Sequence, residues 1–148
     1  MNDKVKTVYI AGPITGDPKY KSKFSAAADL LMQDGYAVIN PVKAFWHKRH
    51  ELRHELLYRC FKLVANVDCL FLLPEWEESE GANAELQVFI DTHCNNADVL
   101  ISDHQNHGFS YVCKNIKEVD FPFPTYGFCP LIRATINEFE KRWVQPPF

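Results

Sequence analysis

The chain alternates between short apolar runs and longer segments with helical spacing. Apolar runs predict strands at 7–11, 36–39, 69–73 and near 99–102. Between them, apolar residues recur at helical spacing in segments around 24–31, about 45–64 and about 85–93. Strands that alternate with helices are typical of a parallel sheet covered on both faces. We therefore expect an α/β fold, Rossmann-like or flavodoxin-like, with about five strands in the sheet.

Turn residues separate these elements, and the last third is less regular. Gly35 is placed to end the first helix, and Asn40-Pro41 stops the second strand. The remaining segments are interpreted as a fifth strand over 108–113, a proline-rich loop over 121–127, a last helix over 130–143 and a tail at 146–148. The pattern contains no internal repeat, so we expect residues 1–148 to form a single domain.

Composition narrows the class of protein. The formal net charge of −3 argues against general binding to nucleic acid. No apolar run approaches about 18 residues, and the first six residues lack the apolar segment of a signal peptide. The five cysteines are odd in number and form no C-x-x-C pair. We therefore expect a cytoplasmic protein with reduced thiols and with neither membrane nor nucleic-acid partners.

The segment Pro74–Glu85 carries the strongest chemical signal. A buried strand leads into a turn with Ser79 and Gly81, and a helix then opens. A hydroxyl and free backbone N–H groups at a helix N-terminus are suited to holding an anion such as phosphate. Glu85 is expected one turn into the helix, where the helix dipole would keep its carboxylate ionised, as a nucleophile must be. This pattern favours a small enzyme that acts on nucleotides.

A second candidate loop, Gly12-Pro13-Ile14-Thr15-Gly16, follows the first strand. Glycine permits unusual backbone angles and a close approach of ligand to backbone. The loop has neither the Gly-Lys-Ser/Thr of a P-loop nor the glycine spacing of a dinucleotide fingerprint. Both loops follow strands of the predicted parallel sheet, so we expect them at its carboxyl edge, where such folds bind ligands.

The segment His50-Glu51-Leu52-Arg53-His54 matches the H-E-x-x-H motif of zinc peptidases. If Leu52 and Leu56 face the core, however, the two histidines point to solvent, about 200° away at 100° per residue. No third metal ligand follows at a suitable spacing. We interpret the match as coincidental and expect no metal site.

Three segments together resemble the nucleoside 2-deoxyribosyltransferase superfamily. They are Tyr9–Gly16, Asn40-Pro41 and the pattern from Leu72 to Glu85, and the similarity extends over 7–95. The chain is most similar to an uncharacterised bacterial and phage branch, and deoxynucleoside 5′-monophosphate N-glycosidases are more distant relatives. The resemblance implies a Rossmann-like fold, cleavage or transfer at an N-glycosidic bond, no cofactor, and a homodimer or higher homo-oligomer whose active sites are completed by a partner subunit.

The resemblance also implies roles for individual residues. Glu85 matches the catalytic glutamate, Tyr9 the assisting tyrosine, and Gly12 to Gly16 the loop that holds phosphate and sugar. Ser79 matches the phosphate-binding serine of the monophosphate-specific relatives, which implies a nucleoside 5′-monophosphate as substrate rather than a free nucleoside. The implied substrate-binding set is completed by Asn40, Trp76 and Gly81. The chemistry fits, because a close carboxylate traps an oxocarbenium-like state as a covalent glycosyl-enzyme.

Two positions depart from the family pattern. Cys60 occupies the position of a partner carboxylate, and Thr15 replaces an arginine that some relatives carry in the first loop. A thiol with a pKa near ~8.5 is a poor substitute for a carboxyl group as the acid that assists the leaving base. An enzyme with Glu85, Tyr9 and Cys60 at its catalytic centre is therefore one hypothesis. A nucleotide-binding module that has lost turnover is the alternative.

Several of these residues also have purely structural interpretations. Tyr9 fits a strand aromatic, Glu85 a surface residue of its helix, and Cys60 a buried structural thiol. Trp76 fits either a core aromatic or a platform on which a base stacks. The acidic residues Glu75, Glu77, Glu78 and Glu80 are interpreted as a solvated loop rather than a metal site.

Overall fold

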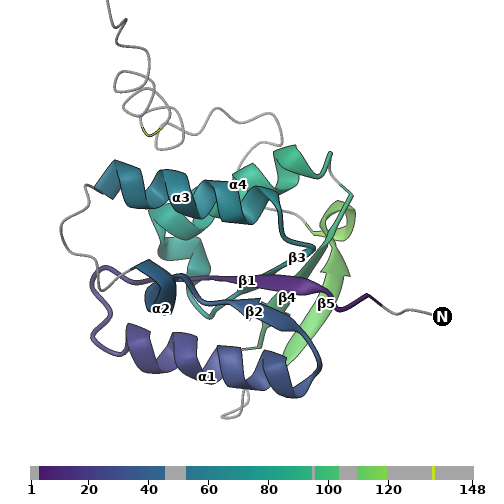
Figure 1. Cartoon of the computed structure of the whole chain (residues 1–148), viewed down its shortest axis with the longest axis horizontal. Coiled ribbons are helices and arrows are strands. Elements are labelled where there is room, and N and C mark those ends of the chain that lie inside the picture. The colour runs from purple at the N-terminus through teal and green to yellow at the C-terminus, as the bar shows by residue number, and fades with distance from the viewer. Residues whose placement is uncertain (1–3, 46–52, 95, 104–109, 120–134, 136–148) are drawn as a thin grey trace, which may run out of the picture.

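The computed structural model describes residues 4–45, 53–94, 96–103, 110–119 and 135. Its strands are β1 (Thr7–Ala11), β2 (Ala37–Ile39), β3 (Cys69–Leu72), β4 (Asp98–Ser102) and β5 (Tyr111–Asn115). Its α-helices are α1 (Tyr20–Gln33), α2 (Pro41–Phe45), α3 (Arg53–Ala65) and α4 (Glu80–Thr92). Two short 3-10 helices, η1 (Trp76–Glu78) and η2 (Ile116–Glu118), complete the described elements. Helices cover both faces of the sheet, as Figure 1 shows, which confirms the predicted α/β class.

The five strands form one sheet in the order β2-β1-β3-β4-β5. Strands β2, β1, β3 and β4 pair in parallel. In this flavodoxin-like order the chain leaves β1 toward one side of the sheet and later returns to its other side as β3. The carboxyl ends of β1 and β3 therefore flank the crevice where such sheets bind ligands.

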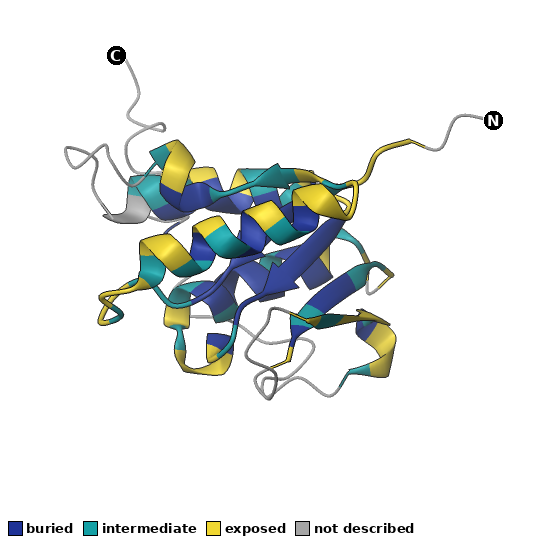
Figure 2. Cartoon of the chain, turned by 90° about the horizontal axis from the view of Figure 1, so that it is seen from below, coloured by how far each residue is buried: buried dark blue, intermediate teal, exposed yellow. Residues whose placement is uncertain are grey.

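Side chains of β1 alternate between the two faces of the sheet. Val8 and Ile10 pack with Phe24 and Leu31 of α1 in one apolar cluster. Tyr9 and Ala11 point to the opposite face, where the second cluster contains residues of α3 and α4. The strand is buried on both faces, and the outer surfaces of the helices carry the exposed residues (Figure 2). Alternation thus directs Tyr9 toward α3 and α4.

The end of α1 shows why the predicted glycine is needed there. Gly35 has a φ of +94°, a left-handed conformation that glycine adopts without steric cost. The Gly35 N–H donates to the Met32 carbonyl and the Tyr36 N–H donates to the Leu31 carbonyl. This pair of hydrogen bonds satisfies the last carbonyls of the helix in a Schellman motif. The predicted cap is confirmed.

Strand β5 corrects the expectation of an all-parallel sheet. It pairs with β4 antiparallel, with Ser102 opposite Tyr111 and Asp98 opposite Asn115. Only residues 103–110 connect the two strands, whereas a parallel pair needs a crossover of about a dozen residues or more. The strand also lies at Tyr111–Asn115 rather than at 108–113. The expected loop, last helix and tail beyond residue 119 lie outside the described residues.

The helix predicted over 45–64 is also different in the structure. The short helix α2 ends at Phe45, residues 46–52 are not among the described ones, and α3 begins at Arg53. In α3 the buried residues are Leu57, Cys60, Phe61 and Val64. The buried face of α3 therefore includes Leu57 rather than Leu56, which is only half-buried and lines the cavity. Cys60 is buried, as its structural interpretation expects. In the part of the chain that the structure describes, no helix is long and apolar enough to span a membrane.

We predict that Gly12→Ala destabilises the fold. A Cβ at Gly12 would lie 2.7 Å from both Cβ and Cδ1 of Leu73, so the two loops that follow β1 and β3 would be pushed apart. Overpacking of this kind costs about 1–3 kcal/mol. Urea denaturation should show this loss, whereas Gly81→Ala should not, because its nearest atom is the Ser79 Oγ at 4.0 Å. Equal stability of the two variants would contradict the close approach.

Candidate functional site

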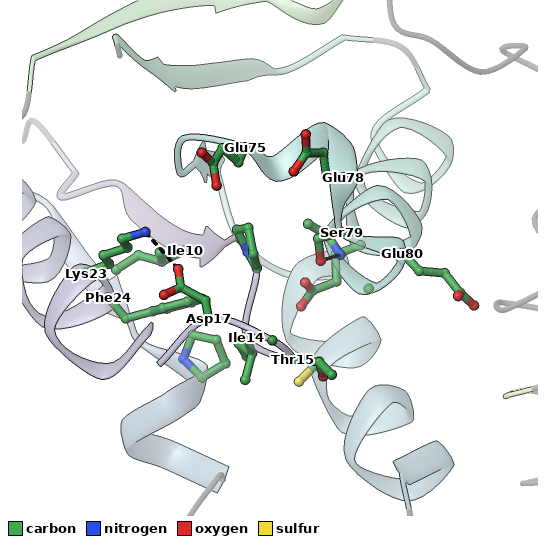
Figure 3. A pocket seen from close by; sticks show the side chains of 18 of the residues that line it. Ile10, Ile14, Thr15, Asp17, Lys23, Phe24, Glu75, Glu78, Ser79 and Glu80 are labelled. Atoms are coloured by element: carbon green, nitrogen blue, oxygen red, sulfur yellow. Dashed lines mark hydrogen bonds and ion pairs between the residues drawn. The ribbon is translucent and has the colours of Figure 1, made fainter. Parts of the chain in front are cut away.

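The loops that follow β1 and β3 enclose a cavity of about 910 Å³ together with α3 and the start of α4. Figure 3 shows these loops facing one another across the space. The cavity lies at the β1–β3 crevice, at the carboxyl edge of the sheet, as the sequence predicts. Of the residues predicted from the sequence, those that line it are Tyr9, Gly12, Pro13, Ile14, Thr15, Gly16, Cys60, Ser79, Gly81 and Glu85.

Ser79 is the N-cap of α4. Its Oγ accepts a hydrogen bond from the Ala82 N–H at 3.1 Å, and its backbone is extended, as a cap residue requires. The hydroxyl proton is not used by this bond, so it remains a donor toward the cavity. The N–H groups of Glu80 and Gly81, at the first two helical positions, have no partner within the helix. The start of α4 therefore offers several neutral donors to a ligand in the cavity.

Glu85 is a buried carboxyl group with a specific partner. Only 8% of its surface is exposed, and the fully buried Tyr9 hydroxyl donates a hydrogen bond to its Oε2. The two residues come from α4 and β1, and they are 76 positions apart in the sequence. The structure thus brings together the two residues that the family pattern singles out.

Cys60 joins this pair from α3. Its side chain is 1% exposed and lines the cavity together with Tyr9 and Glu85. Burial raises the pKa of the Cys60 thiol to about 12, with the Glu85 charge as a second cause. The thiol is therefore neutral at physiological pH and does not replace a carboxylate.

Burial also controls the charge of Glu85. Desolvation raises the pKa of its carboxyl group to about 8, and the hydrogen bond from Tyr9 opposes this shift only in part. The expectation that the helix dipole keeps Glu85 ionised is therefore wrong. Helix α4 begins at Glu80, so Glu85 lies beyond the first turn, where the dipole has little effect. For Tyr9, burial raises the hydroxyl pKa well above its usual value.

Two predicted binding residues lie elsewhere. Asn40 uses its side-chain oxygen to accept from the Val42 N–H at 3.1 Å, so it caps α2, and the next residue, Pro41, lines the cavity instead. Trp76 is 8% exposed and packs in the apolar cluster between the sheet and α4. Neither side chain is placed to contact a ligand in the cavity.

The structure adds charged residues that sequence reasoning did not assign to the site. Glu75, Glu78 and Glu80, interpreted from sequence as part of a solvated loop, line the cavity. Lys23 and Asp17 line it as well, and they form an ion pair at 2.7 Å. Among the described lining residues Lys23 is the only cation. Lys23 follows Asp17 by six positions at the start of α1, and this closeness in sequence was the signal that could have identified the ion pair.

The structure gives no support to a metal centre among the residues that it describes. No group of three or more His, Cys, Asp or Glu residues is arranged there to hold a metal ion. The side chains of the His50–His54 motif lie outside the described part of the chain, so the interpretation of that motif as coincidental stays a prediction.

Comparison with known families gives one match. The family model described as "Domain of unknown function (DUF4406)" matches residues 6–95, which is more than half of the chain. The matched segment runs from the residue before β1 to the end of α4, so it includes every lining residue of the cavity. No curated protein matches the chain. The resemblance to nucleoside 2-deoxyribosyltransferases stays a prediction.

We predict that Glu85→Gln stabilises the protein as the pH rises. The folded-state pKa is above the unfolded one, so the unfolded chain loses its Glu85 proton first and stability falls from about pH 4.5 to about 8. Glutamine does not titrate, so the variant does not lose stability in this way as the pH rises. The variant should match the wild type near pH 4.5 and exceed it by on the order of 2–4 kcal/mol near pH 8.

Urea denaturation across this pH range measures the difference. Glu77→Gln is the matched control, because Glu77 is exposed on the neighbouring 3-10 helix. A pH-independent difference between the Glu85 variant and the wild type would show that Glu85 is ionised throughout in the folded protein.

Proposed function

We propose that this chain, which belongs to the DUF4406 family, cleaves or transfers at the base–sugar bond of a nucleoside 5′-monophosphate. The observation that carries the proposal is the buried Glu85 carboxyl group in the wall of the cavity, with the Tyr9 hydroxyl bonded to it. A carboxyl group in this position is suited to form a covalent bond to the anomeric carbon.

The reaction would proceed in two steps. In the first, the ionised Glu85 attacks C1′ as the C1′–N bond breaks, and the bonding electron pair leaves with the base, which takes up a proton from solvent. In the second, water or an acceptor base attacks C1′, the C1′–O bond to Glu85 breaks, and the attacking group loses its proton to solvent, so that the Glu85 carboxylate is restored. The Tyr9 hydroxyl stabilises the ionised form of Glu85, because its hydrogen bond lowers the carboxyl pKa.

The start of α4 supports a phosphate-bearing substrate. The Ser79 hydroxyl and the N–H groups of Glu80 and Gly81 are donors that can surround an anion at a helix N-terminus. Lys23, the cation that lines the cavity, is already paired with Asp17. Neutral donors of this chain would therefore hold the phosphate. A partner subunit in the proposed cytoplasmic homodimer would supply any positive charge that the phosphate requires in addition.

A second function is favoured by the protonation state of the site. With the Cys60 pKa at about 12 and the Glu85 pKa at about 8, both groups are mainly protonated at neutral pH, so little thiolate or carboxylate is present to act as a nucleophile or base. A nucleotide-binding module without turnover would fit this state. Release of free base, followed by chromatography with a panel of ribo- and deoxynucleoside monophosphates, separates the two functions, because a binding module shows saturable binding and no release.

Replacement of Glu85 tests the nucleophile. Glu85→Ala should lower base release by on the order of 10³-fold or more while nucleotide binding survives. In the wild type, kcat/KM should rise about tenfold per pH unit below pH 8 and level off above it, because only the ionised carboxylate attacks. Measurements from pH 7 to 9.5 avoid the phosphate titration near pH ~6. Turnover that survives in a folded Glu85→Ala variant would rule out the mechanism.

Replacement of Ser79 tests phosphate recognition. Ser79→Ala should weaken 5′-monophosphates by roughly 10- to 100-fold and free nucleosides far less, because a charge-assisted hydrogen bond contributes about 1.5–3 kcal/mol. Ser79→Asp is the matched variant: it keeps the helix cap but repels phosphate, so it should bind only the nucleoside. Calorimetric titration measures both ligands. An equal loss for both would mean that Ser79 acts only as a cap.

A further inference from the structure

Glu75 has a backbone conformation that is unusual for its residue type. Its φ is +67° and its ψ is +18°, in the left-handed region, and it directly precedes the 3-10 helix η1. Residues with a Cβ atom rarely adopt this conformation, and glycine adopts it freely. A glycine would therefore form the same turn without strain. Strained residues of this kind are found preferentially at functional sites.

The side chain of Glu75 belongs to the cavity wall. Figure 3 shows Glu75 and Glu78 on one side of the cavity, across from Ile14 and Thr15. The strand β3 ends three residues before Glu75, so the turn places this exposed residue at the carboxyl edge of the sheet. Among the contacts within the described part of the chain, the Glu75 carboxylate has no hydrogen-bond or ion-pair partner.

The charge of this wall determines what it can bind. Ionised carboxylates accept hydrogen bonds and donate none. The nearby cation of the lining, Lys23, is held by Asp17 at 2.7 Å. A ligand group that faces Glu75 and Glu78 must therefore supply donors, because a carbonyl oxygen or a phosphate would meet like charge.

We propose that Glu75 is a specificity-determining residue that accepts a hydrogen bond from a neutral donor of the substrate, either an exocyclic amino group of the base or a hydroxyl of the sugar. This inference rests on the function proposed above, for which it names the substrate class. The left-handed conformation of Glu75 places this acceptor in the cavity wall at a cost in strain that glycine would avoid. The site would then discriminate between nucleotides that differ only in this donor.

Two kinds of ligand pair test for the donor. Adenosine and inosine 5′-monophosphates, like cytidine and uridine 5′-monophosphates, differ by an amino group in place of an oxo group, and the adjacent ring nitrogen carries a hydrogen only in the oxo member. Each ribonucleotide and its 2′-deoxy counterpart differ by one hydroxyl. Equilibrium binding to the full chain, together with base release, gives a preference ratio within each pair, and the ratio identifies the base or the sugar as the source of the donor.

Three variants test the residue. Glu75→Gly removes the acceptor and the strain, so the preference ratio should fall by about 10-fold and Tm should rise by roughly 2–5 °C. Glu75→Gln keeps the side-chain shape but adds a hydrogen-bond donor. If the base supplies the donor in the wild type, this variant should shift the preference toward the oxo member of each pair of bases. If the sugar supplies it, the variant should lower the preference for the ribonucleotide over its 2′-deoxy counterpart. Glu77→Gln, an exposed neighbour that does not line the cavity, should retain the wild-type ratio.

The outcomes separate this inference from the proposed function. If Glu75→Gly raises Tm but leaves the preference ratio unchanged, the inference is overturned, because the strained conformation of Glu75 would then not contribute to ligand recognition. A wild type without preference in either kind of pair would overturn it as well. Absence of base release from every ligand would contradict the proposed enzyme, whereas the binding ratios would still decide the role of Glu75.

Discussion

The structure is organised around a carboxyl group that is buried between a sheet and two helices. Glu85 of α4 lies against Tyr9 of β1. The hydrogen bond from the Tyr9 hydroxyl partly compensates for the contacts with water that the Glu85 carboxyl group loses on burial. Uncompensated burial of such a group would be costly, so the relative positions of β1 and α4 are constrained to keep this contact. Helix α3 closes the same space with the Cys60 thiol. The cavity at the end of β1 and β3 follows from this arrangement, because both loops must leave the sheet around it.

The central part of the fold could be predicted from sequence because its signals are local. Strands β1 and β3 are buried on both faces, so they appear as uninterrupted apolar runs, and the loops after them carry the glycines and the capping serine. The charge of Glu85 could not be predicted, since it depends on burial by α3 and β1 rather than on its place in α4. Trp76 and Asn40 were misplaced for a similar reason: packing and helix capping, both decided in three dimensions, use their side chains. The antiparallel orientation of β5 could not be predicted, because a short apolar run does not reveal whether a strand is parallel or antiparallel to its neighbour.

The site combines two electrostatic requirements that conflict. The nucleophile of the proposed reaction must be ionised, yet an ionised Glu85 would add to the negative charge that Asp17, Glu75, Glu78 and Glu80 already place in the cavity wall. Burial resolves part of the conflict, because a protonated Glu85 does not repel an anionic ligand as it enters. Ionisation is then required only for the chemical step. One cavity could in this way accept the negatively charged substrate proposed above and still contain five carboxyl groups.

The antiparallel hairpin at the edge of the sheet has a consequence for solubility. The family segment ends at residue 95, before β4 begins, so it contains the whole cavity but only three of the five strands. Without β4, the free edge of β3 would be a fully buried apolar strand exposed to other chains, which is the kind of edge that promotes intermolecular strand pairing and aggregation. Strand β5 then moves the edge outward to a strand with exposed residues, among them Lys114. The hairpin thus protects the half of the molecule that contains the cavity from aggregation through strand pairing, although it contributes no residue to the cavity.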